Sequence, residues 1–344
     1  MPFMIPEEYL AELTSVGSRD AVVHEGMEVR RFDDLQPDTE HEIDGFAFRT
    51  LPEPGERLAT FATVNDVHFG ETVCGLVDGH PEVGPVFRAE PGDEPYPEMM
   101  NRGAVAEMAA VEPEAVLVKG DLTAEGSDDE YAAFLAMYDP VFGDRLRHVR
   151  GNHDAYLGQQ FAASPTQEVA LDGVRLVLLD TTVPRKSSGS LSRDQLDWLD
   201  ALAADSDRPV LVFGHHHAWN PAAGERPDTY FGIHPDASEA LVELVARRRS
   251  IIGYFAGHTH RNRVRRFAAT GEVPWVEVSA VKDYPGAWAE YRVHDGGVVQ
   301  VFHRISTPEA LTWTEKTRNM FNGLYATYAL GSIDDRCFVA ASRA

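Results

Sequence analysis

The stretch Ala115–Gly126, AVLVKGDLTAEG, joins a short apolar run to a glycine and an aspartate. Apolar runs of this length that end at glycine are typical of buried strands. A similar design, a short apolar run followed by histidine, aspartate or asparagine, occurs four more times, in ATFATVNDVHFG (59–70), LRHVRGNHDAY (146–156), PVLVFGHHHAW (209–219) and IIGYFAGHTHRN (251–262). Helical patterns lie between these runs, for example over residues 98–113 and 192–207, so the sequence predicts an α/β domain.

The polar residues behind these strands are expected to converge, because open α/β sheets bind ligands beyond the carboxyl ends of their strands. Two pairs, D-x-H and H-x-H, are spaced so that on extended backbone each pair points to one side. The candidate donors are Asp66, His68, Asp121, Asn152, His215, His258 and His260. A set of ligand atoms that contains oxygen and nitrogen but no sulfur suits zinc, manganese, iron or cobalt better than calcium or magnesium. Seven donors suit two ions about 3.5–4 Å apart that share one carboxylate.

Each candidate also has an ordinary structural explanation when it is taken alone. A single His68 or His258 is more often a structural histidine, Asp121 a turn or helix-cap residue, and Asn152 a turn residue. The histidine triplet that begins at His215 is weak support for a metal site by itself, because exposed loops carry such runs. The five clusters in order favour the metal site over these separate explanations.

Composition limits the class of protein. A chain of 344 residues with 43% hydrophobic content and without about 18 consecutive apolar residues predicts one large globular domain with appendages and no membrane span. The formal charge of −24 disfavours a nucleic-acid partner. Cys74 and Cys337 match no disulfide or zinc pattern and are expected to be free thiols. The first residues lack a basic leader, which predicts a cytoplasmic protein.

The order DVH, GD, GNHD, GH and GHTH resembles the motifs of the calcineurin-like metallophosphoesterases over roughly residues 58–304. The segments GDLT, GNHD and GSLSRDQLDWL resemble the bacterial cyclic-nucleotide and glycerophosphodiester phosphodiesterases most. The resemblance implies an α/β fold in which two packed mixed β-sheets are flanked by helices, as a four-layer sandwich with a small N-terminal β extension.

The resemblance also implies roles for the residues. It gives one set of ligands for each metal, with Asp121 bridging: Asp66, His68, Asp121 and His260 for the first, and Asp121, Asn152, His215 and His258 for the second. His216 and His217 are expected to lie beyond the ligands, toward substrate or solvent. His153 would stabilise developing charge or protonate the leaving group, and Asp154 would orient it.

These roles predict a phosphoric ester hydrolase with two divalent or mixed-valence metal ions, of manganese, iron, zinc or cobalt. The expected reaction is hydrolysis of a small phosphodiester by attack of a metal-bound hydroxide. Two alternatives stay open: a phosphomonoesterase of the same fold, and a catalytically silent metallophosphoesterase-like scaffold. The expected partner is a small phosphate ester, and a homo-oligomer is left open.

The flanks suggest a division of the chain into residues 1–56, 57–305 and 306–344. The first part resembles the closing strands of a fibronectin type III module, with Leu35, Pro37 and Thr39 in place but His41 where a tyrosine is expected. The last part is expected to be a structural or interfacial helix and a tail. Residues 69–100 are expected to form either a lid or a plain surface loop. Strands after His260, joined at HDGG (294–297), are expected to build a second sheet packed on the first.

Overall fold

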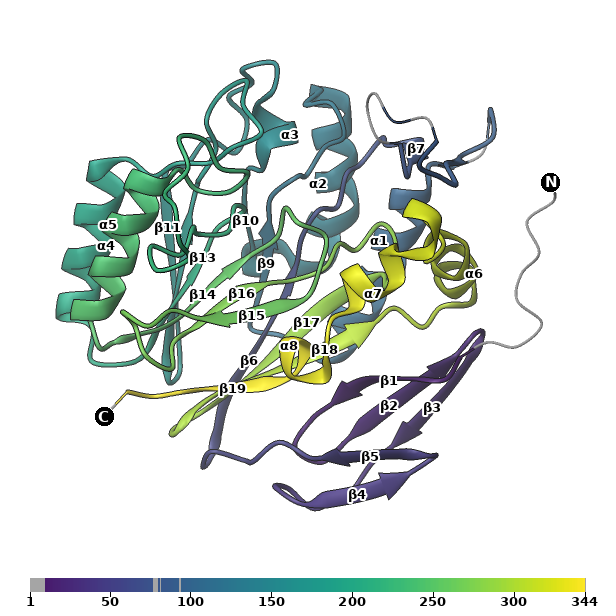
Figure 1. The fold of residues 1–344 in the computed structure, drawn as a ribbon, viewed down its shortest axis with the longest axis horizontal. Coiled ribbons are helices and arrows are strands. Elements are labelled where there is room, and N and C mark those ends of the chain that lie inside the picture. Colours follow the sequence, from purple (N-terminus) through teal and green to yellow (C-terminus); the bar gives the residue numbers. More distant parts are fainter. Residues whose placement is uncertain (1–9, 77–79, 81, 93, 344) are drawn as a thin grey trace.

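Two six-stranded mixed sheets form the centre of the computed structural model, which describes residues 10–76, 80, 82–92 and 94–343 (Figure 1). The first sheet has the order β10-β9-β6-β17-β18-β19, with bounds β6 (Arg57–Val64), β9 (Ala115–Lys119), β10 (Leu146–Val149), β17 (Ala287–His294), β18 (Gly297–Arg304) and β19 (Phe338–Ala341). The second has the order β11-β12-β13-β14-β16-β15, with bounds β11 (Thr166–Leu171), β12 (Val174–Leu179), β13 (Val210–Phe213), β14 (Ile251–Ala256), β15 (Arg263–Arg266) and β16 (Pro274–Glu277).

The five motif-bearing strands are divided between the sheets. In the first sheet β6, β9 and β10 run parallel, and in the second β13 and β14 run parallel. Parallel strands place their carboxyl ends at one edge of a sheet. The motifs therefore gather at one end of the sandwich, near α3 (Asn152–Ala155) at the top of Figure 1.

Helices cover the outer face of each sheet. The first sheet packs on α1 (Tyr96–Ala110), α2 (Asp128–Phe142) and α6 (Pro308–Thr317), and the second on α4 (Arg193–Asp205) and α5 (Pro235–Arg247). Sequence signals fix two of the helix starts, because Ser127 and Ser192 form capping boxes with Glu130 and Gln195. The predicted four-layer α/β sandwich is confirmed.

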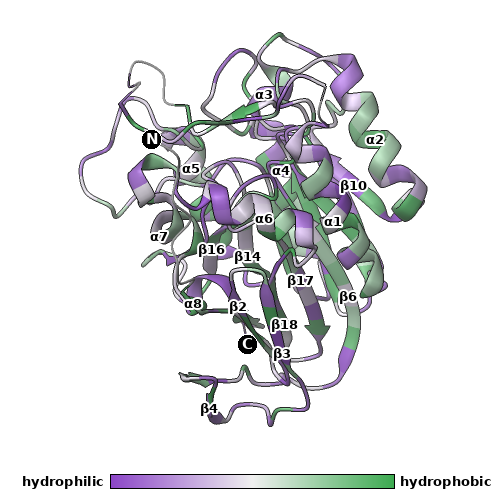
Figure 2. Cartoon of the chain, turned by 90° about the vertical axis from the view of Figure 1, so that its right-hand side faces the viewer, coloured by the Kyte–Doolittle hydropathy of each residue, from purple (hydrophilic) through white to green (hydrophobic). Residues whose placement is uncertain are grey.

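The main core lies between the two sheets. Phe61 of β6 stacks on Tyr291 of β17 with ring centroids 4.5 Å apart, and both rings pack edge-on against Phe213 of β13. Figure 2 shows hydrophobic colour along β6 and β14, the strands that carry two of the motifs. Burial on both faces explains why these strands read as continuous apolar runs.

The N-terminal residues form two small antiparallel sheets, and β1 of the first sheet contacts β18. One contains β1 (Glu12–Val16), β2 (Ala21–Glu25) and β3 (Glu28–Phe32), and the other β4 (Glu40–Ile43) and β5 (Phe46–Arg49). The buried Arg336 ties β1 to the rest of the chain by donating to the carbonyl oxygens of Leu13 at 2.7 Å and Thr14 at 3.0 Å. The divisions at residues 56 and 305 and the fibronectin likeness stay predictions.

Two expectations about the C-terminal third are wrong. The hairpin at HDGG is present, but β17 and β18 join the sheet of β6 and β9 instead of building a separate one. The single helix expected over residues 308–331 is divided into α6, η2 (Phe321–Gly323) and α7 (Tyr325–Leu330), and the expected tail contains α8 (Ile333–Arg336) and the edge strand β19. β19 pairs with β18 because Phe338 and Ala340 alternate into the core between the sheets.

The remaining described elements are small. Residues 69–100 include the short hairpin of β7 (Val73–Cys74) and β8 (Phe87–Arg88), while positions 77–79, 81 and 93 of the expected lid or loop lie outside the described residues. The 3-10 turn η1 (Gly143–Arg145) follows α2. Cys74 and Cys337 are buried free thiols, as predicted. In the described part of the chain, every helix is too short or too polar to cross a bilayer.

Candidate metal centre

The loops that follow the motif strands are hydrogen-bonded to one another. The amide of Asp66 donates to the carbonyl of Gly120 at 3.1 Å, and the amide of His68 donates to the carbonyl of Asp121 at 2.9 Å. In the second sheet, the loops after β13 and β14 are joined in the same way, because the amide of Gly257 donates to the carbonyl of His215 at 2.9 Å. These bonds bring together the candidate donors that the sequence spreads over almost two hundred residues.

The backbone at the candidate donors is not extended, which corrects the expectation that D-x-H and H-x-H present their side chains like a strand. Positive φ angles between 47° and 68° occur at Asp66, His68, Asp121, His258 and His260. Non-glycine residues adopt this left-handed region rarely, and each costs about 1–3 kcal/mol unless surrounding structure holds it. Such conformations concentrate at functional sites.

Asp121 lies between the two predicted ligand sets. Its Oδ2 is 3.5 Å from Nε2 of His68, a predicted ligand of the first ion. The same oxygen is 3.3 Å from Nε2 of His215, a predicted ligand of the second. Asn152 Oδ1 lies 3.1 Å from the same His215 nitrogen, while its amide nitrogen donates to the Tyr156 hydroxyl at 2.6 Å. The carboxylate therefore has the position that a bridging ligand requires.

Backbone carbonyls orient two of the histidines. Nδ1 of His215 lies 2.8 Å from the carbonyl oxygen of Lys119, and Nε2 of His258 lies 2.8 Å from that of Phe231. Because a carbonyl oxygen only accepts, these ring nitrogens carry the proton. In the neutral rings the opposite nitrogen, Nε2 of His215 and Nδ1 of His258, is left as the donor for an ion.

Carboxylates stand beside the other two histidines. Glu71 Oε2 is 2.9 Å from Nδ1 of His68, and Asp283 Oδ2 is 3.6 Å from Nδ1 of His260. Lys282 joins the two carboxylates, with Nζ 2.6 Å from Glu71 Oε1 and 3.5 Å from Asp283 Oδ2. The sequence prediction missed Glu71, Lys282 and Asp283; only the i, i+3 spacing of Glu71 from His68 offered a weak signal.

Charges in the cluster favour positive charge at its centre. Burial opposes ionisation of Asp121, but His215, His153 and His68 together outweigh it and hold the pKa of the carboxyl well below its ordinary value. Burial also opposes positive charge on His215 and His260. Nearby carboxylates outweigh it: Asp121 raises the pKa of His215 to about 9, and Asp66 raises the pKa of His260 to about 10. Burial and His215 lower the pKa of His258 to about 3. The carboxylates thus provide the electrostatic environment that a cation needs.

The two predicted catalytic residues have different surroundings. His153 lies with its ring 4.5 Å from that of His68, its amide donates to Asp121 Oδ1 at 2.9 Å, and its Nδ1 is 2.6 Å from the carbonyl oxygen of Ala124. Asp154 was expected to orient His153, but its carboxylate accepts from loop groups of Leu122, Thr123 and Gly151 at 2.6–3.0 Å. The carbonyl of Ala124 orients the imidazole, and Asp154 holds two motif loops together.

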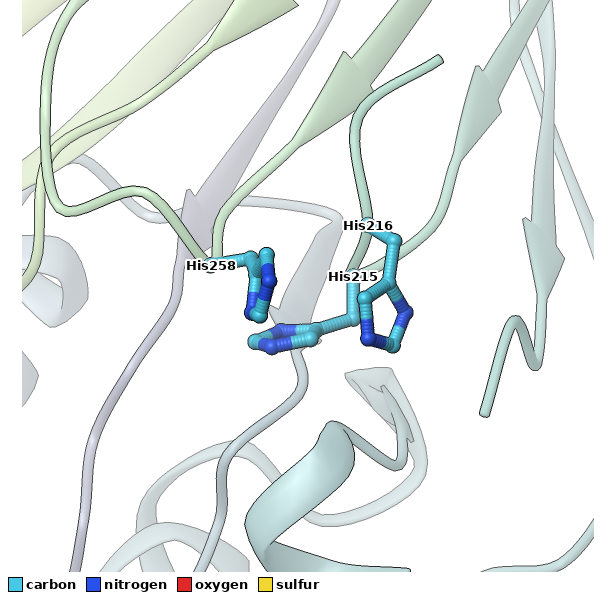
Figure 3. A group of neighbouring side chains, drawn as sticks. All are labelled: His215, His216 and His258. Carbon is cyan, nitrogen blue, oxygen red and sulfur yellow. The ribbon is translucent and has the colours of Figure 1, made fainter. Parts of the chain in front are cut away.

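His216 and His217 do not face solvent or the substrate side, contrary to expectation. His216 is fully buried with Nδ1 2.8 Å from the Thr181 hydroxyl, and His217 Nε2 is 3.0 Å from the Tyr230 hydroxyl. Figure 3 shows His216 next to His215 and His258, and ligand atoms of these three histidines lie within 4.8 Å of one another. The loop turns back here because the amide of Ile233 donates to the carbonyl of His217.

The donor set fits divalent cations. Three further groups have ligand atoms inside the same 4.8 Å limit: Asp66–His68–His260, Asp66–Asp121–His215 and His68–Asp121–His153. Nε2 of His68 is buried without a hydrogen-bond partner among the described residues, as is Nε2 of His216. An unpaired buried nitrogen is costly, and a bound cation would satisfy it.

A cavity of about 590 Å³ opens beside these donors. His68, Asp121, Asn152, His258 and His260 line it, together with His153. Further lining side chains come from the 71–76 segment and from residues 320–328 near the C-terminus. A ligand in the cavity would therefore contact the donors on one side and two chain segments outside the five motifs on another.

Comparisons with known proteins show which family the chain belongs to. Residues 59–262, more than half of the chain, match the family described as calcineurin-like phosphoesterase, so the chain belongs to that family. It is 30% identical over 175 residues to a probable cyclic nucleotide phosphodiesterase of Rhodococcus erythropolis, covering 45% of this chain and 54% of that protein. The chain thus spans about half the length of this relative. The predicted family is confirmed, and membership implies divalent metal ions.

One further sequence relative and one solved structure match a larger share of this chain. A probable glycerophosphodiester phosphodiesterase of Arcobacter nitrofigilis is 27% identical over 243 residues, covering 63% of this chain and 82% of that protein. A solved dimetal phosphatase from Danio rerio superposes with a TM-score of 0.54 at 17% identity, covering 73% of this chain and 98% of the other. At that identity the structural likeness shows the fold alone.

Proposed function

We propose that this member of the calcineurin-like phosphoesterase family is a metal-dependent phosphoric ester hydrolase that cleaves a small phosphodiester. The observation that carries the proposal is the position of Asp121, whose Oδ2 lies 3.5 Å and 3.3 Å from histidines of the two ligand sets. A carboxylate shared in this way suits a pair of ions about 3.5–4 Å apart, the arrangement of many two-metal phosphoesterases.

We assign the candidate ligands to two ions in the way that the motifs predict. Asp66, His68, Asp121 and His260 would hold the first ion, and Asp121, Asn152, His215 and His258 the second. When bound, the ions would act as Lewis acids on the phosphoryl oxygens and make water nucleophilic near neutral pH. Manganese, iron, zinc and cobalt all suit these oxygen and nitrogen donors, in divalent or mixed-valence pairs.

His153 would act on the substrate and not on the metals. Its Nδ1 is held by the carbonyl of Ala124, which leaves Nε2 as the nitrogen available to a substrate in the cavity that His153 lines. From there the imidazole would stabilise charge on the transferred phosphoryl group or protonate the leaving alkoxide. Asp154 would support this step indirectly by fixing the loops that carry Asp121 and His153.

The preference for a diester rests on the names of the two relatives, a probable cyclic nucleotide phosphodiesterase and a probable glycerophosphodiester phosphodiesterase. We further propose that the protein acts in the cytoplasm on a small phosphate ester. The formal charge of −24 opposes long nucleic acids at long range, so a polynucleotide substrate is not expected. A homo-oligomer remains compatible with this function.

The test compares bis-p-nitrophenyl phosphate with p-nitrophenyl phosphate in the presence of manganese. Faster hydrolysis of the diester is the expected result, and Asp121→Asn should remove it because both ions lose their shared ligand. Faster hydrolysis of the monoester would favour a phosphomonoesterase. No turnover of either ester by protein that has bound metal would favour the silent scaffold and contradict the proposal.

A further inference from the structure

Exposed apolar side chains gather at the cavity beside the candidate ligands. Nine large hydrophobic side chains are exposed in the described part of the chain, and four of them line this one cavity. The four are Leu76, Phe231, Leu324 and Tyr328, which we call the apolar wall. Single exposed hydrophobic residues are normal on a protein surface, whereas a cluster at a cavity marks a binding surface.

The apolar wall is attached to the loop that carries two predicted ligands. The ring of Phe231 stacks on His258 with centroids 4.1 Å apart, and the Tyr328 hydroxyl donates to the carbonyl of Thr259 at 2.8 Å. Leu324 keeps 72% of its surface exposed and Phe231 keeps 58%. The wall is thus both next to the donors and uncovered.

Part of the apolar wall comes from a segment outside the family match, which ends at residue 262. Leu324 and Tyr328 belong to the C-terminal region, which is fixed to the site by two contacts. The Tyr325 hydroxyl donates to Asp283 Oδ1 at 2.7 Å, and the Asn262 amide nitrogen donates to the carbonyl of Ala329 at 3.0 Å. The five motifs therefore give no information about this side of the cavity.

The charged residues of the cavity near the apolar wall are occupied with one another. Lys282 is paired with Glu71 and Asp283, and Asp283 also accepts from Tyr325. The hydroxyls of a polar alcohol would compete with these existing contacts for the same groups. An apolar ring, in contrast, would cover Leu324 and stack against the aromatic members of the wall.

We propose that the apolar wall binds an aromatic ring on the alcohol portion of a phosphodiester substrate and so sets the substrate class. The inference rests on the proposed function, because the phosphoryl group would occupy the donors while the ring occupies the wall. The cavity of about 590 Å³ is within the usual size of small-molecule sites and exceeds what a phosphoryl group alone requires. Leu324 and Leu76 act as specificity-determining residues in this arrangement.

The experiment measures binding, so it does not depend on turnover. Phenylphosphonate, cyclohexylphosphonate and methylphosphonate are titrated calorimetrically into the manganese-loaded protein. We expect phenylphosphonate to bind at least about tenfold more tightly than methylphosphonate, because only the phenyl compound covers the wall. Leu324→Ser should reduce that ratio several-fold, and Leu76→Ser/Leu324→Ser should reduce it further, although Phe231 and Tyr328 remain. Leu10→Ser is the matched control, since Leu10 is 76% exposed and does not line the cavity.

The outcomes separate this inference from the proposed function. Equal binding of the phenyl and methyl compounds, or a ratio unchanged in both leucine variants, would overturn the role of the wall while leaving the metal site intact. Cyclohexylphosphonate binding as tightly as phenylphosphonate would overturn the assignment of an aromatic ring. If no phosphonate binds to protein that contains metal, the proposed function fails and the inference fails with it.

Discussion

His153 occupies a position beside the candidate ligands without belonging to either ligand set. Its amide is hydrogen-bonded to Asp121 and its Nδ1 to Ala124, so the backbone fixes the imidazole at the cavity. A residue held in this way can contribute to the reaction without contributing to metal affinity. The two contributions can therefore be measured separately.

We predict that His153→Ala retains the parent's metal content but hydrolyses an alkyl diester on the order of a hundredfold more slowly, as for loss of one proton donor or charge stabiliser. The loss should be smaller for a nitrophenyl ester, whose leaving group needs little protonation. Steady-state kinetics with both esters and elemental analysis check this. Equal losses would indicate charge stabilisation alone, and loss of metal would show that His153 is a ligand.

A second prediction concerns Glu71, whose carboxylate lies 2.9 Å from Nδ1 of His68. Glu71→Gln should weaken binding of the first ion about 10–100-fold, the usual cost of removing a carboxylate behind a histidine ligand. Competition with a chelator measures the affinity. Glu82→Gln is the control, since Glu82 is exposed and contacts only His80 among the ion pairs of the described residues. Equal affinities in the two variants would remove Glu71 from the metal centre.

Asp66, His68, Asp121 and their partners were predictable because five short motifs occur in a fixed order along the chain. Lys282 and Asp283 were not predictable, since Lys282 reaches Glu71 and Asp283 reaches His260 only through tertiary contacts. The buried position of His216 also escaped prediction. Its surroundings depend on Thr181 and on a loop that turns back at Ile233, neither of which is visible in the triplet itself.

At the scale of elements, β19 shows the limit of reading periodicity in a short segment. Its four residues, Phe338–Ala341, follow two short helices and give too few positions for a reliable alternation. The motif strands β6, β9, β13 and β14 gave a clearer signal because most of their positions are apolar and each run is followed by a polar motif. Which of the two sheets a motif strand joins depends on the strands with which it pairs. The sequence of a single strand does not specify those partners.

We predict that Phe338→Ala lowers the free energy of unfolding by about 3–5 kcal/mol, because the ring packs in the core between the sheets. Val339→Ala on the same strand should cost about 1 kcal/mol or less, because Val339 lies on the opposite, partly exposed face. Urea denaturation measures both. Similar costs for the two substitutions would contradict the alternation of β19.

At the scale of the whole molecule, the N-terminal sheets and the C-terminal segment are joined through buried polar contacts. Glu12 of β1 accepts from the Tyr284 hydroxyl at 2.7 Å and pairs with Arg318 at 2.6 Å. His24 of β2 is 2.7 Å from the Thr14 hydroxyl and 3.1 Å from that of Ser306. Because His24 is a buried titratable group, its contacts make the stability of the protein sensitive to pH.

Burial, followed by Arg304 and Arg31, lowers the pKa of His24 to about 2 in the folded protein. In the unfolded chain the pKa is about 6.5, so below that pH only the unfolded state binds the proton. The contribution of neutral His24 to the free energy of unfolding is complete above pH 6.5 and is lost as the pH falls toward 2. Between pH 7 and pH 5 the loss is about 2 kcal/mol.

Replacing His24 by glutamine should remove this part of the pH dependence. Urea denaturation at pH 7 and pH 5 should show a smaller difference in unfolding free energy for His24→Gln than for the parent. Glu107, His303 and the two arginines line the same cavity as His24 and are unchanged in the variant, so the comparison isolates the one imidazole. Identical pH dependence in the two proteins would show that His24 is not buried in neutral form.

The central claim is that one chain holds two ions through a shared Asp121 and hydrolyses a phosphodiester with them. Elemental analysis of manganese-loaded protein, made on the same sample as the bis-p-nitrophenyl phosphate assay, tests it most directly. We predict about two equivalents of metal in the active parent protein, with both equivalents weakened and activity lost in Asp121→Ala. A stable single equivalent in fully active protein, or an Asp121→Ala variant that keeps both ions, would contradict the claim.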